Sequence, residues 1–302
     1  MINRRRAPSS AISSQKKRDG HILEEDFASL IGASVIKGTQ KADIKDKLNN
    51  LYSVKSGKKW QLFLYNFQRI SSSAHLKILK GCLDAFPSNI KKYFEDRISC
   101  IKYKEDYIKK NGREEARGLS NNDVSKALGY NEYISSKTKL QHETKKVRDK
   151  LKDKATLRLF LNEAIFNNDE VSLMAIMDTT YLKDDLFKVF SKEYVLDVLC
   201  EEVYPDVSSS GNVPEDYNVG GQKTLLRYYK DGKPKNIAEI EIRNDSENKY
   251  RLVRFNMYSK DVLGILLRPN NMIDVYKINS KVEVYGRAIE IMELKKSAQK
   301  FC

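Results

Sequence analysis

Hydrophobic residues near the N-terminus recur at the spacing of one helix face. Leu23, Phe27, Leu30 and Ile31 stand at positions i, i+4, i+7 and i+8. Side chains at these intervals project from the same side of an α-helix, so the pattern predicts an amphipathic helix over residues 22–31.

Three short apolar runs follow, at residues 33–36, 42–44 and 51–55, and polar turns separate them. Runs of this length bounded by turn residues predict two or three short strands joined by tight turns. Residues 60–70 return to a helical spacing and predict a second helix.

The rest of the chain divides into a helical middle and a strand-rich end. Residues 74–167 are Lys-rich and predict several helices, and residues 184–202 predict another. A loop rich in Ser, Gly, Asn and Pro follows at residues 208–221. Beyond it, alternating runs predict a hairpin around Asp231-Gly232 and then further strands, over residues 225–229, 238–243, 250–258, 273–278 and 282–291.

This order predicts an α/β protein of the α+β type with three consecutive parts. Residues 1–18 are expected to form a flexible basic arm, and residues 19–205 a core with a helical region. Residues 222–302 are expected to form a β-rich C-terminal region.

Composition excludes several classes of protein. The chain has 302 residues, of which 40% are hydrophobic and 32% charged. It is long enough for a sizeable core, and no apolar run approaches the roughly 20 residues that span a bilayer. Collagen, coiled-coil rods, wholly disordered chains and membrane proteins are therefore excluded.

The net charge of +14 is unevenly distributed. Residues 1–150 contain 32 Lys and Arg against 17 Asp and Glu, whereas residues 151–302 contain 23 against 24. An excess of positive charge in one half favours a polyanionic partner, most often nucleic acid. The alternative is that the lysines reflect a Lys-rich, A·T-biased genome.

The cysteines exclude a zinc ribbon or zinc finger. Cys82, Cys100, Cys200 and Cys302 are too far apart for a paired Cys-x-x-Cys site. The arginines at positions 4–6 are followed by Ser and Lys rather than by the apolar stretch of a signal peptide. We therefore expect reduced thiols in a cytoplasmic protein.

One segment combines residues that suit phosphodiester chemistry. Asp43 ends one predicted strand, and Ser53 and Lys55 lie on the next, where a period of two places both on one face. The helix predicted before them carries two further carboxylates, Glu24 and Glu25. Carboxylate oxygens can hold Mg²⁺, which polarises the phosphate and generates hydroxide, and a nearby lysine stabilises negative charge or orients water. The predicted metal ligands are Asp43 and Glu24.

This order of residues resembles the PD-(D/E)xK nuclease superfamily, which includes many type II restriction endonucleases. Nine residues separate Asp43 from Ser53, and Gln61-x-x-x-Tyr65 resembles an element that follows the catalytic lysine in RecB-type exonuclease domains. The resemblance covers about 45 of the 302 residues. It implies a restriction-endonuclease-like mixed sheet core flanked by helices, with Gln61 and Tyr65 supporting the site from a helix.

Ser53 departs from the superfamily pattern, which has an acidic residue at this position. Some restriction enzymes also place Ser two residues before the Lys and take a carboxylate from a following helix. Here that region offers Gln61 and Gln68, so the missing acid is expected from Glu24 or Glu25. A catalytically inactive version of the fold is the alternative.

A second acidic cluster competes with this assignment. Asp231 precedes Glu239 and Glu241 on a predicted strand, and Arg243 could take the place of the lysine. Alternation of Ile with Glu is also the ordinary pattern of a half-exposed strand, and Asp-Gly is a hairpin turn signal.

These observations lead to the hypothesis of a Mg²⁺-dependent endonuclease that cleaves double-stranded DNA at a specific sequence. A homodimer is expected, because both strands must be cut. The β-rich region at residues 222–302 is expected to provide DNA recognition or a dimer surface. The expected DNA contacts are Lys58, Lys59, Lys145, Lys146 and Arg148.

Two alternatives stay open. The first is a non-catalytic DNA-binding protein of a plasmid or phage, acting in replication or regulation. Residues 120–130 faintly resemble the start of a helix-turn-helix, although an ordinary helix hairpin fits them better. The second alternative is a scaffold protein without nucleic-acid affinity.

Overall fold

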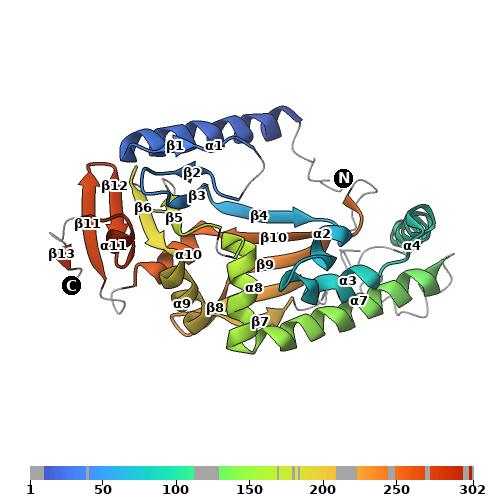
Figure 1. Ribbon diagram of the computed structural model, residues 1–302. Coiled ribbons are helices and arrows are strands. Elements are labelled where there is room, and N and C mark those ends of the chain that lie inside the picture. Colours follow the sequence, from blue (N-terminus) through green and yellow to red (C-terminus); the bar gives the residue numbers. More distant parts are fainter. Residues whose placement is uncertain are drawn as a thin grey trace. The chain divides into compact units, whose positions relative to one another are not determined.

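The structure is a computed structural model that describes most of the chain. The described residues are 10–38, 41–111, 129–168, 170–178, 181–182, 184–208, 223–243, 249–268, 273–294 and 299–300. They form two compact units (Figure 1), each built from separate stretches of sequence. The first unit draws on residues 1–60, 161–201 and 258–302, and the second on residues 61–160 and 202–257.

Over the described residues, the first unit contains an eight-stranded mixed sheet, with strands in the order β1-β2-β3-β5-β6-β12-β11-β13. The β3–β5 and β6–β12 pairs are parallel, and the other pairs are antiparallel. The elements are α1 (Ser10–Ile31), β1 (Ser34–Val35), β2 (Ile44–Lys45), β3 (Leu51–Ser56), β5 (Leu173–Met177), β6 (Phe187–Ser191), α9 (Lys192–Glu202), α10 (Ser259–Leu266), β11 (Asp274–Asn279), β12 (Val282–Tyr285), α11 (Ala288–Ile291) and β13 (Gln299–Lys300).

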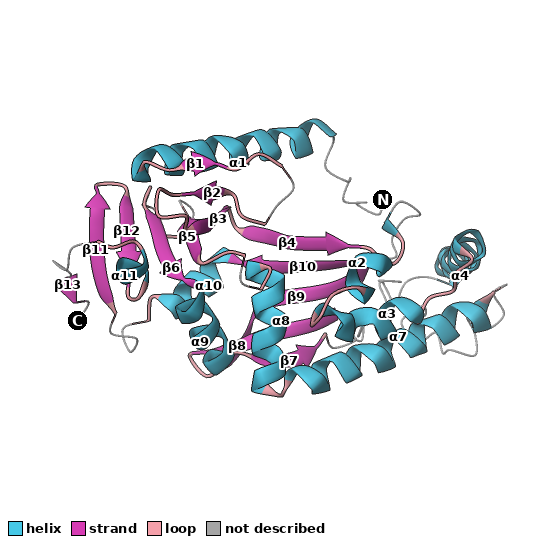
Figure 2. Cartoon of the chain, viewed as in Figure 1, coloured by secondary structure: helices cyan, strands magenta, loops and turns pink. Residues whose placement is uncertain are grey.

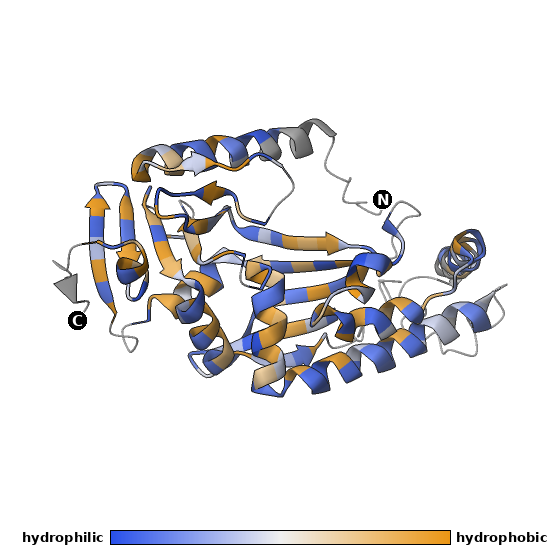
Figure 3. Cartoon of the chain, viewed as in Figure 1, coloured by the Kyte–Doolittle hydropathy of each residue, from blue (hydrophilic) through white to orange (hydrophobic). Residues whose placement is uncertain are grey.

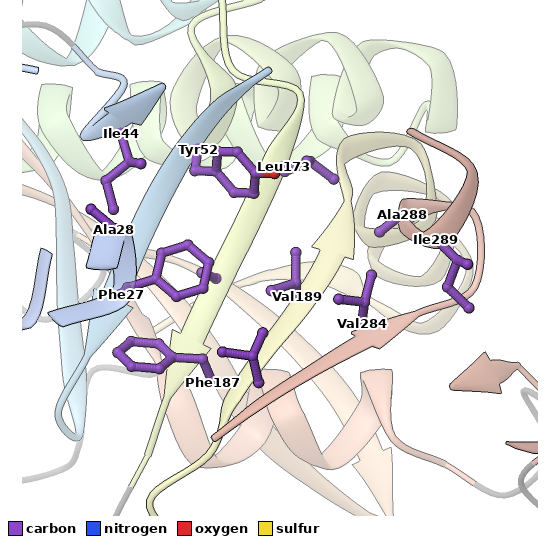
Figure 4. Close-up of a cluster of buried hydrophobic side chains, with 12 residues drawn as sticks. Phe27, Ala28, Ile44, Tyr52, Leu173, Phe187, Val189, Val284, Ala288 and Ile289 are labelled. Atoms are coloured by element: carbon purple, nitrogen blue, oxygen red, sulfur yellow. The ribbon is translucent and has the colours of Figure 1, made fainter. Parts of the chain in front are cut away.

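The core of the first unit lies between α1 and one face of this sheet (Figure 4). The Phe27 ring of α1 is fully buried, with its centroid 5.7 Å from that of Tyr52 and 4.8 Å from that of Phe187. Alternate residues of β5, β6 and β12 complete the cluster. Successive side chains of a strand point to opposite faces, so Ser53 and Lys55 project from the face of β3 that Tyr52 does not use.

The second unit contains a five-stranded sheet, in the order β4-β10-β9-β8-β7, together with helices (Figure 2). The neighbouring pairs β7–β8, β8–β9 and β9–β10 are each antiparallel. The elements are β4 (Lys59–Tyr65), α2 (Phe67–Ser71), the 3₁₀-helix η1 (Leu76–Leu79), α3 (Lys80–Asp84), α4 (Ile90–Asn111), α7 (Tyr130–Leu151), α8 (Lys154–Phe166), β7 (Tyr204–Val207), β8 (Lys223–Lys230), β9 (Lys233–Arg243) and β10 (Leu252–Tyr258). The boundaries between the units fall within β4, α8, α9 and β10.

The α+β class expected from the sequence is confirmed, but the consecutive division is not what the structure shows. Each unit combines segments from both halves of the chain, because strand pairing joins residues far apart in sequence. Residues 10–18, expected to be a flexible arm, are the first turns of α1, and residues 1–9 lie outside the described part. The expected linker at 208–221 lies almost entirely outside it as well.

Several local predictions were wrong because they assigned a helix to a segment that forms a strand, or a strand to one that forms a helix. Residues 60–65 form strand β4 rather than a helix, and residues 187–191 form β6 ahead of helix α9. The expected strand over 282–291 ends at residue 285, and α11 follows it. A short apolar run fits the repeat of a helix as well as that of a strand. Pairing with a neighbouring strand then determines the conformation.

Two further observations concern membranes and cysteines. Within the described residues, no helix is both long and apolar enough to cross a membrane. Cys82, Cys100 and Cys200 are buried free thiols. Burial raises the pKa of Cys82 to about 12, so this side chain is an unreactive core residue.

Candidate active site at the β2–β3 hairpin

A short hairpin places Asp43 opposite Ser53. The backbone N–H of Asp43 donates to the carbonyl of Tyr52 over 2.8 Å, and Ile44 pairs with Tyr52. In the turn, the Asp46 carboxylate accepts the backbone N–H groups of residues 48 and 50, each over 2.9 Å, and the Tyr52 hydroxyl over 2.7 Å. Aspartate favours such turns because its carboxylate bonds the backbone a few residues on.

Asp43, Ser53 and Lys55 meet on one face of this hairpin, and we call them the Asp43 cluster. Oδ2 of Asp43 accepts the backbone N–H of Val54 over 2.7 Å and the hydroxyl of Ser53 over 3.2 Å. The same oxygen lies 3.7 Å from Nζ of Lys55, which donates to Ser53 Oγ and to the carbonyl of Val54. The Lys55 and Asp43 side chains retain 16% and 22% of their exposure, so solvent reaches the cluster.

Glu170 is a carboxylate near the cluster that the sequence analysis missed. It precedes β5, the strand that pairs in parallel with β3. Its Oε1 accepts the backbone N–H groups of Lys41 over 3.3 Å and of Ala42 over 3.4 Å, directly before Asp43. No short motif could reveal it, because more than 120 residues separate Glu170 from Asp43.

Lys41 adds a second amine beside the cluster. Its Nζ donates to the carbonyl of Ala164 over 2.8 Å. Burial and the positive charge of Lys55 lower the pKa of Lys41 to about 7, although the carboxylates of Asp43 and Glu170 oppose this shift. At neutral pH the amine is therefore divided between its charged and neutral forms.

The structure does not bring the remaining predicted site residues together with Asp43. Oε2 of Glu24 lies 3.1 Å from Nδ1 of His21 on its own helix, and among the described residues no hydrogen bond or ion pair joins Glu24 to Asp43. Helix α1 packs against the opposite face of β3, through Phe27. Gln61 is an exposed residue of strand β4, where a supporting helix was expected.

Three oxygen atoms of the cluster gather around one cation, the ammonium group of Lys55. The Asp43 carboxylate, the Ser53 hydroxyl and the Val54 carbonyl all lie around the single Lys55 ammonium. Mg²⁺ prefers oxygen ligands of these kinds and usually keeps several waters. No group of three His, Cys, Asp or Glu that could hold a metal occurs in the part of the chain that is described.

The predicted DNA-contacting residues divide between a turn and a helix. Lys58 is exposed in the turn before β4, and Nζ of Lys59 lies 5.1 Å from the centre of the Tyr258 ring. Helix α7 is mostly hydrophilic (Figure 3), and Lys145 is exposed on it.

The other two basic residues predicted on α7 pair with acids of the same helix. Nζ of Lys146 lies 2.7 Å from Glu143, and Arg148 donates to Asp149 over 3.0 Å. The Lys146–Glu143 pair is three residues apart, a spacing typical of ion pairs on a solvated helix surface. Residues 120–128 of the helix-turn-helix candidate lie outside the described residues.

The acidic residues of the competing cluster form hydrogen bonds and ion pairs within the second sheet. Glu239 is buried and accepts the Asn256 amide and the Lys223 ammonium, each over 3.2 Å. Glu241 pairs with Arg254. Asp231 is a turn residue with φ of 52°. These contacts indicate a structural role, because the carboxylates already have cationic or amide partners.

Glu239→Ala is therefore expected to destabilise the protein by about 1–3 kcal/mol, because Asn256 and Lys223 lose their acceptor in a buried position. Urea denaturation followed by circular dichroism measures the change. Glu239→Gln, which keeps an acceptor oxygen, is the matched control and is expected to lose less. Unchanged stability in Glu239→Ala would contradict the structural role.

The Asp43 cluster is thus the candidate active site, with Lys41 and Glu170 beside it. The chain matches no protein-family model, no curated protein and no solved structure.

Proposed function

We propose that the protein is a Mg²⁺-dependent endonuclease that cleaves double-stranded DNA at a specific sequence, in the manner of a type II restriction endonuclease. The observation that carries the proposal is the meeting of Asp43, Ser53 and Lys55 on one face of the β2–β3 hairpin. A metal-binding carboxylate beside a lysine is one arrangement that can catalyse phosphodiester hydrolysis.

Each residue near the site has a distinct role in this proposal. Asp43 and the Val54 carbonyl would hold Mg²⁺, which supplies polarisation of the phosphate and acidification of water. Lys55 orients the attacking water or stabilises the negative charge that develops on the phosphate. Ser53 and the Val54 N–H hold the Asp43 carboxylate in place. Glu170 fixes the backbone that leads into Asp43.

The order of elements supports the resemblance to the PD-(D/E)xK superfamily. Helix α1 precedes the hairpin that carries Asp43 and Ser53-x-Lys55, as the resemblance implies. In the proposed site Glu170, rather than Glu24, is the second acidic residue next to Asp43. Homodimerisation, so that two sites cut both strands, and a cytoplasmic role in restriction belong to the same proposal.

Incubation of the purified protein with supercoiled plasmid DNA and Mg²⁺ tests this function. We expect discrete linear fragments, because a specific endonuclease cuts at fixed positions. Chelation of the metal with EDTA is expected to stop cleavage, and renewed addition of Mg²⁺ is expected to restore it. Intact plasmid under Mg²⁺ and Mn²⁺, across several DNAs of different sequence, would contradict the proposal.

A non-catalytic DNA-binding protein of a plasmid or phage is the second candidate. It is favoured by the excess charge of residues 1–150 together with the lone carboxylate of the Asp43 cluster. This candidate predicts salt-sensitive binding of DNA without cleavage under any divalent metal.

A further inference from the structure

The tip of the β8–β9 hairpin is a continuous exposed segment of the second unit. It comprises residues 229–236, all of which are exposed, and we call it the hairpin tip. The turn at Asp231 and Gly232 has φ angles of 52° and 70°, as in the tight turns that suit twisted hairpins. The tip is therefore a regular two-stranded ribbon.

Three lysines lie on one face of this ribbon. Lys230 pairs directly with Lys233 across the strands, and Lys235 lies two residues further along β9. Side chains two apart on a strand, and those directly opposite, share a face. Lys233 and Lys235 are thus about 6.7 Å apart along the strand, a step comparable to that between neighbouring phosphates of one DNA strand.

This arrangement is unfavourable for the isolated hairpin. Like charges directly opposite each other destabilise a strand pair. Within the described residues, none of the three lysines forms a salt bridge, whereas Arg227 lower on the same hairpin pairs with Asp206 and bonds Asn236 over 2.9 Å. Positive charge is therefore neutralised at the base of the hairpin and left without carboxylate partners at its tip.

The other face of the tip holds an aromatic stack. The Tyr229 ring lies with its centroid 5.1 Å from that of Tyr204 on β7, at an interplanar angle of 23°. Tyr229 nevertheless keeps 60% of its exposure. The stack holds the ribbon from the side opposite the lysines, so the lysine face is presented on an ordered support.

We propose that the hairpin tip is a DNA-binding element, in which Lys230, Lys233 and Lys235 contact successive phosphates of a duplex. A two-stranded ribbon has the width that the major groove of B-DNA admits, about 12 Å. Contacts of lysines with phosphates position a protein on DNA without reading its sequence. The inference rests on the proposed function in one respect only, namely that the partner is double-stranded DNA.

The test measures binding apart from cleavage. The full chain carrying Asp43→Asn is titrated in EDTA against a fluorescein-labelled 30-base-pair duplex, and fluorescence anisotropy gives Kd over a range of NaCl concentrations. The test variant adds Lys230→Gln, Lys233→Gln and Lys235→Gln. The control variant instead adds Lys91→Gln, Lys109→Gln and Lys152→Gln, whose lysines are exposed in the same unit but pair with Glu95, Asp106 and Asp149.

Loss of three phosphate contacts is expected to reduce the slope of log Kd against log salt by about 3, and to raise Kd at 0.1 M salt on the order of a hundredfold. The control variant loses the same charge and is expected to keep the slope. Thermal unfolding of all three proteins shows whether they fold alike. An unchanged slope in the test variant, or equal loss in both variants, would overturn the proposal.

Two outcomes separate this inference from the proposed function. Loss of slope in the test variant, combined with failure of the unsubstituted protein to cut plasmid DNA, supports the hairpin tip and refutes the nuclease. Plasmid cleavage combined with an unchanged slope in the test variant supports the nuclease and refutes the hairpin tip as a DNA contact. Lysine-dependent binding to phosphatidylserine vesicles, without binding to the duplex, would overturn the hairpin tip as a DNA contact and assign it to a membrane surface.

Discussion

Asp43→Asn is expected to lower the rate of DNA cleavage on the order of a thousandfold while leaving the fold intact. The amide keeps the shape of the side chain and an oxygen for the Val54 N–H, but it removes the negative charge that would hold Mg²⁺. Single-turnover cleavage of a plasmid under saturating Mg²⁺ measures the rate, and near-native thermal unfolding shows that the hairpin survives.

Lys55→Ala is expected to cause a loss of similar order, between about a hundredfold and a thousandfold, because it removes the positive charge beside the reacting phosphate. Lys45→Ala is the matched control, since Lys45 is exposed on the neighbouring strand β2. The two active-site substitutions are expected to be far from additive when combined. Undiminished cutting by either single variant would remove the Asp43 cluster as the active site.

Phe27→Ala is expected to destabilise the protein by about 3–5 kcal/mol, the range found when a buried aromatic side chain is truncated. The ring is fully buried between α1 and the sheet, against Tyr52 and Phe187. Its removal leaves a cavity at the centre of the first core. Denaturant unfolding with global fitting of the midpoint and slope measures the loss.

Ile22→Ala on the same helix is the control for this substitution. Ile22 keeps 55% of its exposure, so its truncation is expected to change the free energy of unfolding by no more than about 0.5 kcal/mol. A loss below 1 kcal/mol in Phe27→Ala would contradict the packing of α1 on the β3 face.

The structure favours a different DNA-binding surface from the one predicted on α7, whereas the proposed active site keeps Asp43, Ser53 and Lys55. The sequence pointed to Lys145, Lys146 and Arg148 on α7, but Lys146 and Arg148 pair with neighbouring acids. Within the described residues, the three lysines of the hairpin tip form no such pairs. Counting charges along the chain does not show which of them are neutralised, because ion pairs depend on the positions of side chains in the folded unit.

Elements whose causes are local could be predicted from the sequence. The β2–β3 hairpin follows from apolar alternation and from the turn at Asp46, and the same alternation places Ser53 and Lys55 on one face. Asp43 could therefore be predicted to lie beside them. The β8–β9 hairpin is equally local, because an Asp-Gly turn joins two alternating strands.

Features that depend on distant segments of the chain could not be predicted before the fold was known. Residues 60–65 became a strand, and Glu170 came to lie beside Asp43 because β5 pairs with β3 across more than 100 residues. Helix α1 packs on the opposite face of β3 from Lys55. Among the described residues, Glu24 pairs with His21 and forms no hydrogen bond or ion pair with Asp43. Local spacing determines which face of a helix or strand a residue occupies. Which segments pack against that face depends on burial of the apolar surface of the whole unit.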